Sequence, residues 1–200
     1  KADGLSNEQQ QGLYGELHFL QKFLSKKITT PGKTLEYWVG VDAALRDFQG
    51  NEWAVEAKTT CTNNPQKVTI NGERQLDETL LSDLFLYHCS VEVSKFNGET
   101  LPKKVDNLRT ILREDVPALS MFNEKILQSG YFDEEAELYA NRSYKIRDEH
   151  YYHIKDDFPR IKEEELRDGV SDVKYAIILA MCSDYCIPEN KLFNTIKSHE

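Results

Sequence analysis

Asp47, Glu56 and Lys58 have the types and spacing for metal-assisted chemistry on a phosphodiester, and they lie in the stretch RDFQGNEWAVEAKTT, residues 46–60. Two carboxylates can hold a hard divalent cation such as Mg2+, which prefers oxygen ligands. Such a cation polarises a phosphodiester and acidifies a bound water. A neighbouring lysine can position that water and offset the negative charge that develops on the phosphate. The plainer alternative is an ion pair on a solvated sheet face, and a motif this short favours it when taken by itself.

A Gly–Asn dipeptide at 50–51 predicts a hairpin turn that brings these residues together. In such a hairpin Asp47 lies opposite Ala54. Because side chains alternate along a strand, Ala54, Glu56 and Lys58 then share the face of Asp47. Diagonal neighbours across a strand pair have β-carbons about 7 Å apart or less, so the two carboxylates can close on one cation. The other face of this strand carries Trp53, Val55 and Ala57.

Two further polar residues are candidates for the same site. Glu16 projects between Leu20 and Phe23, within the apolar stripe of the first expected helix. A carboxylate there needs an interior partner, which a metal ion or Lys58 would supply; a half-exposed glutamate is the alternative. Gln75 follows an Asn–Gly turn and starts the next expected helix, where it can point back toward the sheet. Alone, it indicates nothing.

The residues before this stretch predict a helix and then extended chain. Ser6 is followed three residues later by Gln9, which is the pattern of a capping box. Leucines recur at helical spacing after it, so we expect the first helix to end near Lys26. After an interruption at TTPGKT, residues 35–48 predict two short strands.

Helices and strands are mixed along the rest of the chain. A turn leads into an expected helix within 71–81, and residues 101–115 and 117–130 predict two more. Helices that bracket a mixed sheet indicate an α/β (α+β) protein, and not a helix bundle or a β-sandwich. The expected strands are 52–60, 67–70, 83–96, 144–154 and 173–182.

Length and composition are those of an ordinary globular chain. The 200 residues, 40% hydrophobic and 30% charged, suffice for one sizeable core. No apolar run approaches the roughly 20 residues of a membrane span, and no signal peptide is visible. The four cysteines lack Cys-x-x-Cys spacing and fit reduced thiols in a reducing cytosol. We therefore expect a cytoplasmic protein without membrane contact. Because the chain starts at Lys1, we expect it to be the later part of a longer one.

The net charge of −9 opposes a nucleic-acid binder, which normally has a basic surface. Its distribution weakens that objection. Residues 1–76 contain nine basic and nine acidic residues, so this part is neutral. The remaining 16 basic and 25 acidic residues carry the whole excess, in runs such as 133–137 that we interpret as solvated faces. A local basic groove is compatible with this pattern.

Other residue types predict no second site. His150 and His153 lie in EHYYH, which lacks the H-E-x-x-H spacing, and strand histidines are mostly structural. His18 lies about 200° around the helix from Glu16, so we expect it to face solvent. The absence of a glycine-rich phosphate loop argues against an ATPase or a dinucleotide enzyme, and no nucleophile-elbow sequence supports a serine hydrolase.

In this order, GLYGELHFL, RDF, AVEAKTT and RQL resemble the PD-(D/E)XK nuclease superfamily. In that superfamily a helical Glu, a strand Asp, an E-x-K strand and a helical Gln recur. The chain is similar, more narrowly, to a prokaryotic family known only by its PD-(D/E)XK motif, because YWVG, RQLD and the late FPRI…GV…VKYAI also fit that family. The likeness spans most of the chain, although only the central motif is chemically specific.

The resemblance implies a restriction-endonuclease-like fold, in which helices flank a mixed four-stranded sheet. It assigns Asp47 and Glu56 to Mg2+, with Mn2+ as a substitute, and adds the Ala57 carbonyl as a ligand. Lys58 becomes the catalytic lysine. The proline of the motif is replaced by Arg46, a position that aids geometry and binds no metal. The resemblance gives supporting catalytic roles to Glu16 and Gln75.

The resemblance also implies an activity, namely Mg2+-dependent endonuclease cleavage of DNA in prokaryotic restriction or defence. We expect one nuclease-like domain over residues 1–200, with a strand and helix extension from about residue 100. DNA is the expected partner, together with a second copy of the chain or a partner subunit of a defence system. The alternative is a catalytically silent subunit that binds DNA or a protein and organises a complex. The intact Asp47, Glu56 and Lys58 set favours the enzyme.

Overall fold

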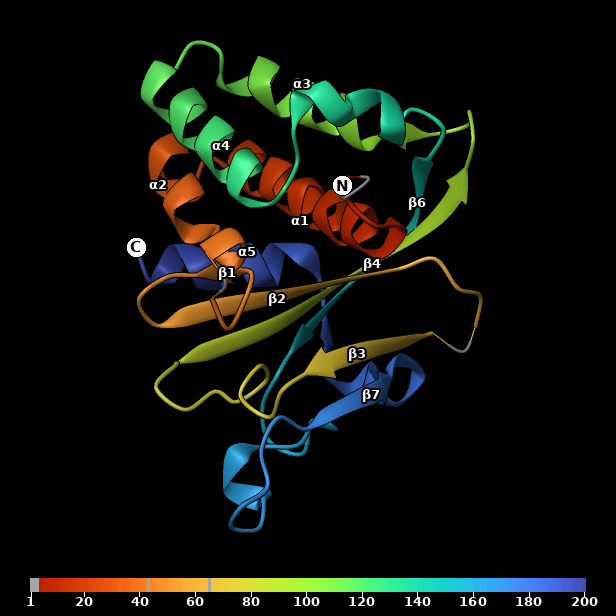
Figure 1. Cartoon of the computed structure of the whole chain (residues 1–200). Helices are drawn as coiled ribbons and strands as arrows, with labels where there is room; N and C mark the ends of the chain where they lie inside the picture. The colour runs from red at the N-terminus through yellow and green to blue at the C-terminus, as the bar shows by residue number, and fades with distance from the viewer. Residues whose placement is uncertain (1–3, 43, 65) are drawn as a thin grey trace.

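The computed structural model describes residues 4–42, 44–64 and 66–200, in which helices cover one face of a twisted sheet (Figure 1). A ribbon of two antiparallel strands, β3 and β7, lies on the other side of the sheet. The helices are α1 (Asn7–Lys26), α2 (Pro31–Tyr37), α3 (Leu101–Leu112), α4 (Val116–Gln128) and α5 (Glu189–Ser198). Short 3-10 turns span Gly40–Asp42, Asp133–Tyr139, Glu163–Glu165 and Leu179–Tyr185.

Within the described residues, the main sheet has six strands in the order β1-β2-β4-β6-β5, with β8 also paired to β6. Strands β2 and β4 run parallel, whereas the other pairs are antiparallel. The predicted α/β class and the mixed, restriction-endonuclease-like sheet flanked by helices are confirmed, with more strands than the four expected. The strands are β1 (Phe48–Gln49), β2 (Trp53–Thr60), β3 (Lys67–Asn71), β4 (Asp83–Ser94), β5 (Glu99–Thr100), β6 (Ser143–His153), β7 (Lys174–Ile178) and β8 (Cys186–Ile187).

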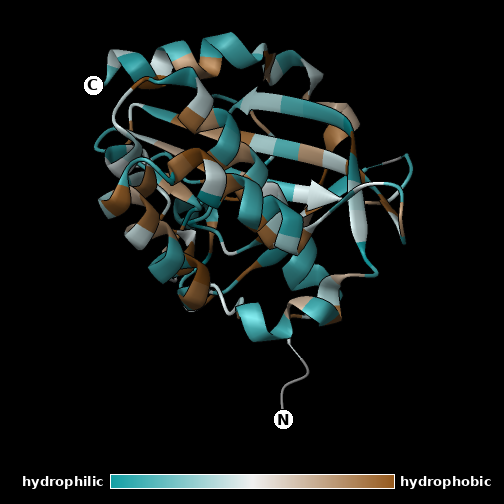
Figure 2. Cartoon of the chain, turned by 90° about the horizontal axis from the view of Figure 1, so that it is seen from above, coloured by the Kyte–Doolittle hydropathy of each residue, from teal (hydrophilic) through white to brown (hydrophobic). Residues whose placement is uncertain are grey.

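The two faces of β2 enter different hydrophobic cores. Trp53 and Val55 pack in the core beneath α1, whereas Ala54 packs in the core between the sheet and the β3–β7 ribbon. This is the alternation that the sequence predicts, and it directs Glu56 and Lys58 to the ribbon side of the sheet. From above, the covering helices show hydrophobic and hydrophilic residues interleaved along their length, as amphipathic helices do (Figure 2).

Helix α1 begins and ends where the sequence predicts. The Ser6 hydroxyl accepts a hydrogen bond from the Gln9 N–H, and the Gln9 side chain accepts one from the Ser6 N–H, which completes the capping box. At the other end Lys27 adopts a left-handed conformation with φ of 50° and closes the helix. The predicted helices within 101–115 and 117–130 are confirmed as α3 and α4.

Four sequence-based assignments of elements are wrong. Residues 35–48 hold the end of α2, a 3-10 turn and the first residue of β1 in place of two strands, with Ala43 outside the described residues. Thr30 caps α2 and Pro31 occupies its first turn, so TTPGKT starts a helix where an interruption was expected. Within 71–81, Asn71 ends β3 and the residues after it form turns and no helix. Strand β7 ends at Ile178, where a 3-10 turn replaces the rest of the expected strand.

Across the described residues, every helix is too short or too polar to cross a lipid bilayer.

Candidate active site

The β1–β2 hairpin places Asp47 directly beside Glu56. Phe48 pairs with Val55, and continuing this antiparallel register by one residue sets Asp47 opposite Glu56. The predicted register, with Asp47 opposite Ala54, is therefore wrong by two residues. Asp47 and Glu56 were expected to be diagonal neighbours, but they lie directly opposite each other.

The β1–β2 turn is longer than predicted, which explains the two-residue shift in register. The shift leaves the site residues on one face. The Gly50 N–H donates to the Trp53 carbonyl at 2.9 Å, so the loop holds more residues than the tight turn that was expected. A shift of two residues preserves the face on which each side chain lies, because strand alternation has a period of two. Asp47, Glu56 and Lys58 consequently remain on one face.

Backbone contacts hold Asp47 in place. Its carbonyl accepts hydrogen bonds from the N–H groups of Val39 and Gly40 at 2.9 and 3.0 Å. Its carboxylate Oδ2 accepts a hydrogen bond from the Ala57 N–H at 2.7 Å. The N–H and C=O of one strand residue point to the same side, so the Ala57 carbonyl also faces the Asp47 side of β2.

Gly40 lets the carboxylates of Asp47 and Glu16 approach the same stretch of backbone. A Cβ at this position would lie 2.8 Å from Asp47 Oδ1 and 3.2 Å from Glu16 Oε2. The Trp38 indole N–H donates to Glu16 Oε2 at 2.9 Å and orients the glutamate. Glu16 is half-buried, and its partner is the neutral Trp38 indole, where a metal ion or Lys58 was expected.

Close packing of α1 on β2 sets the position of Glu16. A Cβ at Gly15 would lie 1.7 Å from Thr59 Oγ1, a distance that no side chain could occupy. The glycine therefore allows the helix to lie against the strand that carries Glu56 and Lys58. This contact fixes the distance between the helical glutamate and the sheet.

Lys58 lies between Glu56 and Gln75. Its Nζ is 2.8 Å from Glu56 Oε1 and donates to Gln75 Oε1 at 3.2 Å. Gln75 Oε1 also accepts a hydrogen bond from the Asn71 N–H at 3.1 Å. Gln75 thus reaches the site as predicted, although it does so from a turn and not from a helix.

Arg46 holds the turn that carries Gln75, a role the sequence did not indicate. Its Nε donates to the Gln75 carbonyl at 3.2 Å, and Nη2 donates to the carbonyls of Arg74 and Asp77. The arginine is buried, and these carbonyls are ones that a helix would have used internally. The residue in the place of the motif's proline therefore both shapes the turn and explains why no helix forms there.

All the residues predicted for the site line a single open cavity of about 700 Å3. The walls of the cavity come from α1, β2, β3 and the turn after β3, with Lys174 of β7 at its rim. The predicted residues in its lining are Glu16, Asp47, Glu56, Ala57, Lys58 and Gln75.

The carboxylates of the cavity hold their protons unusually strongly. Burial, with the Asp47 charge beside it, raises the pKa of Glu56 to about 8, even though Lys58 opposes the shift. Burial also raises the pKa of Asp47 to about 6, against the Ala57 hydrogen bond and Lys58. The pKa of Glu16 is raised well above its usual range by burial and by Asp47. The positive charge of Lys58 therefore does not outweigh the burial of these carboxylates.

The donor set fits a hard divalent cation. Glu56 Oε2 is buried and has no hydrogen-bond partner among the described residues, so one carboxylate oxygen is left for a ligand. Across the same residues no group of three or more His, Cys, Asp or Glu side chains is arranged to hold a metal ion. Mg2+ needs only one or two carboxylates because it keeps several waters, whereas structural zinc takes four protein ligands. Asp47, Glu56 and the Ala57 carbonyl suit the former.

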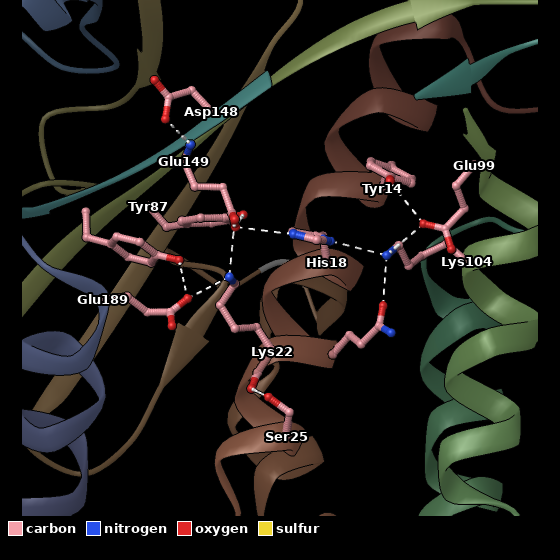
Figure 3. Close-up of polar contacts among 12 residues, drawn as sticks. Tyr14, His18, Lys22, Ser25, Tyr87, Glu99, Lys104, Asp148, Glu149 and Glu189 are labelled. Atoms are coloured by element: carbon pink, nitrogen blue, oxygen red, sulfur yellow. Dashed lines mark hydrogen bonds and ion pairs between the residues drawn. The ribbon is translucent and has the colours of Figure 1, made fainter. Parts of the chain in front are cut away.

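His18 faces the protein interior, so the predicted solvent exposure is wrong. Its Nε2 lies 3.2 Å from Glu149 Oε1, and its Nδ1 lies 3.2 Å from Lys104 Nζ (Figure 3). The side of α1 opposite Glu16 is covered by α3 and β6, which no helical periodicity could reveal. We call the connected side chains on this side the α1 ion network: His18, Lys22, Glu99, Lys104, Glu149 and Glu189.

Two strand histidines that lie far apart in the sequence form a stacked pair. The rings of His88 and His150 have centroids 5.6 Å apart, with Nδ1 atoms 3.3 Å apart. Thr60, which lines the cavity, lies 2.8 Å from His88 Nε2. Burial lowers the pKa of His88 to about 4, so this histidine is neutral near neutral pH. Only the β4–β6 register brings the two together.

A sequence-family model described as "Putative PD-(D/E)XK family member, (DUF4420)" matches residues 1–180. No curated protein and no solved structure matches the chain. The matched residues include every residue of the cavity and the whole β3–β7 ribbon.

Proposed function

The chain belongs to the DUF4420 family, and from this premise we propose that it is a divalent-metal-dependent endonuclease that hydrolyses phosphodiester bonds of DNA. The nuclease-like fold follows from the family, whereas the activity rests on the site. The single observation that carries it is the convergence of Asp47, Glu56 and Lys58 on one cavity in which a buried carboxylate oxygen has no partner among the described residues. A role in prokaryotic restriction or defence is part of the proposal and rests on the resemblance alone.

The metal ligands in this proposal are Asp47, Glu56 and the Ala57 carbonyl. Mg2+ or Mn2+ bound there would supply Lewis-acid activation of the phosphodiester and of a water. The protein's part is to hold these oxygens before the ion arrives, through the Ala57 N–H on Asp47 and the β1–β2 pairing. Preorganised ligands avoid the cost of ordering them during the reaction.

Lys58 provides the positive charge for the phosphate. Its ammonium is fixed between Glu56 and Gln75, so it can donate to a phosphate oxygen or to the attacking water without searching for its position. A donor aimed at developing negative charge is often worth about 100- to 1000-fold in rate. Glu16, held by Trp38, lies at the same cavity and can order water there.

Two substitutions separate binding from chemistry. Lys58→Ala should slow nicking of supercoiled plasmid DNA about 100- to 1000-fold, while Mg2+ and Mn2+ affinities stay close to those of the wild type. Asp47→Ala should lose both metal binding and plasmid nicking. Lys103→Ala, on the exposed face of α3, is the matched lysine control and should cleave normally.

Cleavage at the normal rate by Lys58→Ala would show that this lysine is not catalytic. If the wild type and Asp47→Ala bind metal equally poorly and neither cuts DNA, the chain is a silent nuclease-like subunit. Measuring the two variants by calorimetry and by plasmid nicking on the same preparations distinguishes these outcomes.

A further inference from the structure

One row of polar side chains on the β3–β7 ribbon points into the candidate active site. Along β3, Val68 and Ile70 are buried in the core while the residues between and beside them are exposed. Lys174 of β7 pairs with Asn71 at the end of this row. We call this row the ribbon wall of the cavity: Lys67, Thr69, Asn71 and Lys174.

The opposite wall has a different chemistry. It is formed by α1 and presents Glu8, Gln11 and Gly12 to the cavity. Figure 1 shows α1 on one side of strand β2 and the β3–β7 ribbon on the other. A polyanion entering the cavity would therefore meet a carboxylate on the α1 side and two ammonium groups on the ribbon side.

The two lysines of the ribbon wall are available for a ligand. Neither Lys67 nor Lys174 forms an ion pair or a side-chain hydrogen bond with another described residue, although the chain carries 34 acidic residues. By contrast, Lys58, deeper in the cavity, is engaged by Glu56 and Gln75. The ribbon lysines are also solvent-exposed, so contacting a ligand would cost little desolvation.

The floor of the cavity makes such a wall necessary. Metal binding would require ionised carboxylates, and the negative charges of Asp47, Glu56 and Glu16 would then repel a phosphate backbone. One divalent cation would offset only part of that repulsion. Alternate residues of a strand stand about 7 Å apart, so β3 offers a regular line of donors along the entrance. Contacts of this kind position a nucleic-acid backbone without reading its sequence.

We propose that the phosphate backbone of the nucleic-acid strand to be cut runs along the ribbon wall, with phosphates bound by Lys67 and Lys174 and hydrogen-bonded by Thr69 and Asn71. This inference rests on the proposed phosphodiesterase function and names the surface that delivers its substrate. It also accounts for nucleic-acid binding by a chain whose net charge is −9, because the positive charge is local to the cavity.

The test is the salt dependence of oligonucleotide binding by the full chain. Fluorescence anisotropy is followed with labelled single-stranded DNA, duplex DNA and single-stranded RNA, in EDTA and in Ca2+, across a range of salt concentrations. Lys67→Ala and Lys174→Ala should each weaken binding several-fold and lower the slope of log K against log salt by about one, and the double variant by about two. The three oligonucleotides show which backbone the wall prefers.

Two matched variants serve as controls. Lys103→Ala removes an exposed lysine from α3, and Glu8→Gln removes the carboxylate of the opposite wall. The first should change neither affinity nor slope, and the second should not weaken binding. Because all four positions are exposed, thermal melts of the variants should overlay that of the wild type.

The ribbon assignment is overturned if the ribbon variants bind with wild-type affinity and slope, or if the wild type binds none of the oligonucleotides. Plasmid nicking measured in parallel separates this from the fate of the proposed activity. A wild type that binds with the expected slopes but never cuts refutes the hydrolase and leaves the ribbon wall standing. If the wild type cuts DNA and the ribbon variants bind as the wild type does, the hydrolase is supported and the ribbon wall is refuted.

Discussion

Two groups of carboxylates lie on opposite sides of helix α1, and their pKa values are shifted in opposite directions. On one side lie Glu16, Asp47 and Glu56 of the cavity, all with raised pKa values. On the other side lie the carboxylates of the α1 ion network, where burial is outweighed by hydrogen bonds and cations. His18 and Tyr87 hold the pKa of Glu149 at about 2, for example.

The difference lies in how many cations the chain itself provides. In the α1 ion network, Lys22 contacts Glu149 and Glu189 at 3.2 and 2.6 Å, and Lys104 contacts Glu99 at 2.8 Å. In the cavity, within the described part of the chain, Lys58 is the one residue that forms an ion pair with any of the three carboxylates. The acids of the α1 ion network are therefore compensated within the protein, whereas those of the cavity have the charge deficit that the proposed metal ion would fill.

Removing a carboxylate from the α1 ion network should destabilise the fold. Glu149→Gln leaves His18 without its acidic partner and Lys22 with Glu189 alone. The lowered pKa of Glu149 corresponds to a loss of about 3 kcal/mol of unfolding free energy. Urea unfolding at neutral pH measures this.

The effect should depend on pH with a definite sign. The pKa of Glu149 is about 2 in the folded protein and near 4.5 when unfolded, so its stabilisation is present above the unfolded value. The difference between wild type and variant should therefore shrink as the pH falls from 5 toward 2. A difference that is constant over that range would mean that the pair contributes no charge-dependent stability.

Removing a carboxylate from the cavity should have the opposite effect. Glu56 has a folded pKa of about 8 against about 4.5 unfolded, so the folded state binds more protons between these values. Without metal, wild-type stability should fall as pH rises through this range, on the order of 2 kcal/mol from this group. Glu56→Gln should flatten that fall.

Thermal melts in EDTA at several pH values, with and without added Mg2+, test this. Metal should restore stability to the wild type at pH 8 and do little for Glu56→Gln. Equal pH profiles for the two proteins in EDTA would contradict the assignment of Glu56 as a buried, charge-deficient group.

Loosening the turn behind the cavity should give the smallest effect. Arg46→Met removes the hydrogen bonds that hold the turn carrying Gln75, and Gln75 in turn orients Lys58. We expect cleavage to slow about 10-fold with metal affinity unchanged, since a small misplacement of a catalytic group has a cost of this order. Arg74→Ala, which removes an exposed side chain of the same turn, should cleave normally. The measurement is the rate of plasmid nicking. Equal rates for Arg46→Met and Arg74→Ala would exclude a positioning role for Arg46.

The residues of the cavity were predictable because their pattern is local. Strand alternation in AVEAKTT fixes the face of Glu56 and Lys58, and it tolerates the two-residue error in the position of Asp47. Helical spacing likewise directs Glu16 inward, and the capping box defines where α1 begins.

The features that were missed depend on contacts between distant segments. His18 faces inward because α3 and β6 happen to cover its side of α1, and the His88–His150 pair exists only through the β4–β6 register. The turn at Gln75 is shaped by Arg46, 29 residues earlier, which overrides the helical pattern of its own sequence. Local propensity yields to such tertiary contacts.

Calorimetric titration with Mg2+ and Mn2+ tests most directly whether the charge-deficient cavity is a cation site. The wild type and Glu149→Gln should each bind one ion with similar affinity, because the α1 ion network lies on the other side of the helix. Asp47→Asn should bind at least about 10-fold more weakly, since it removes a ligand charge. Equal binding by the wild type and Asp47→Asn, or loss of binding in Glu149→Gln with Asp47→Asn unaffected, would contradict the account.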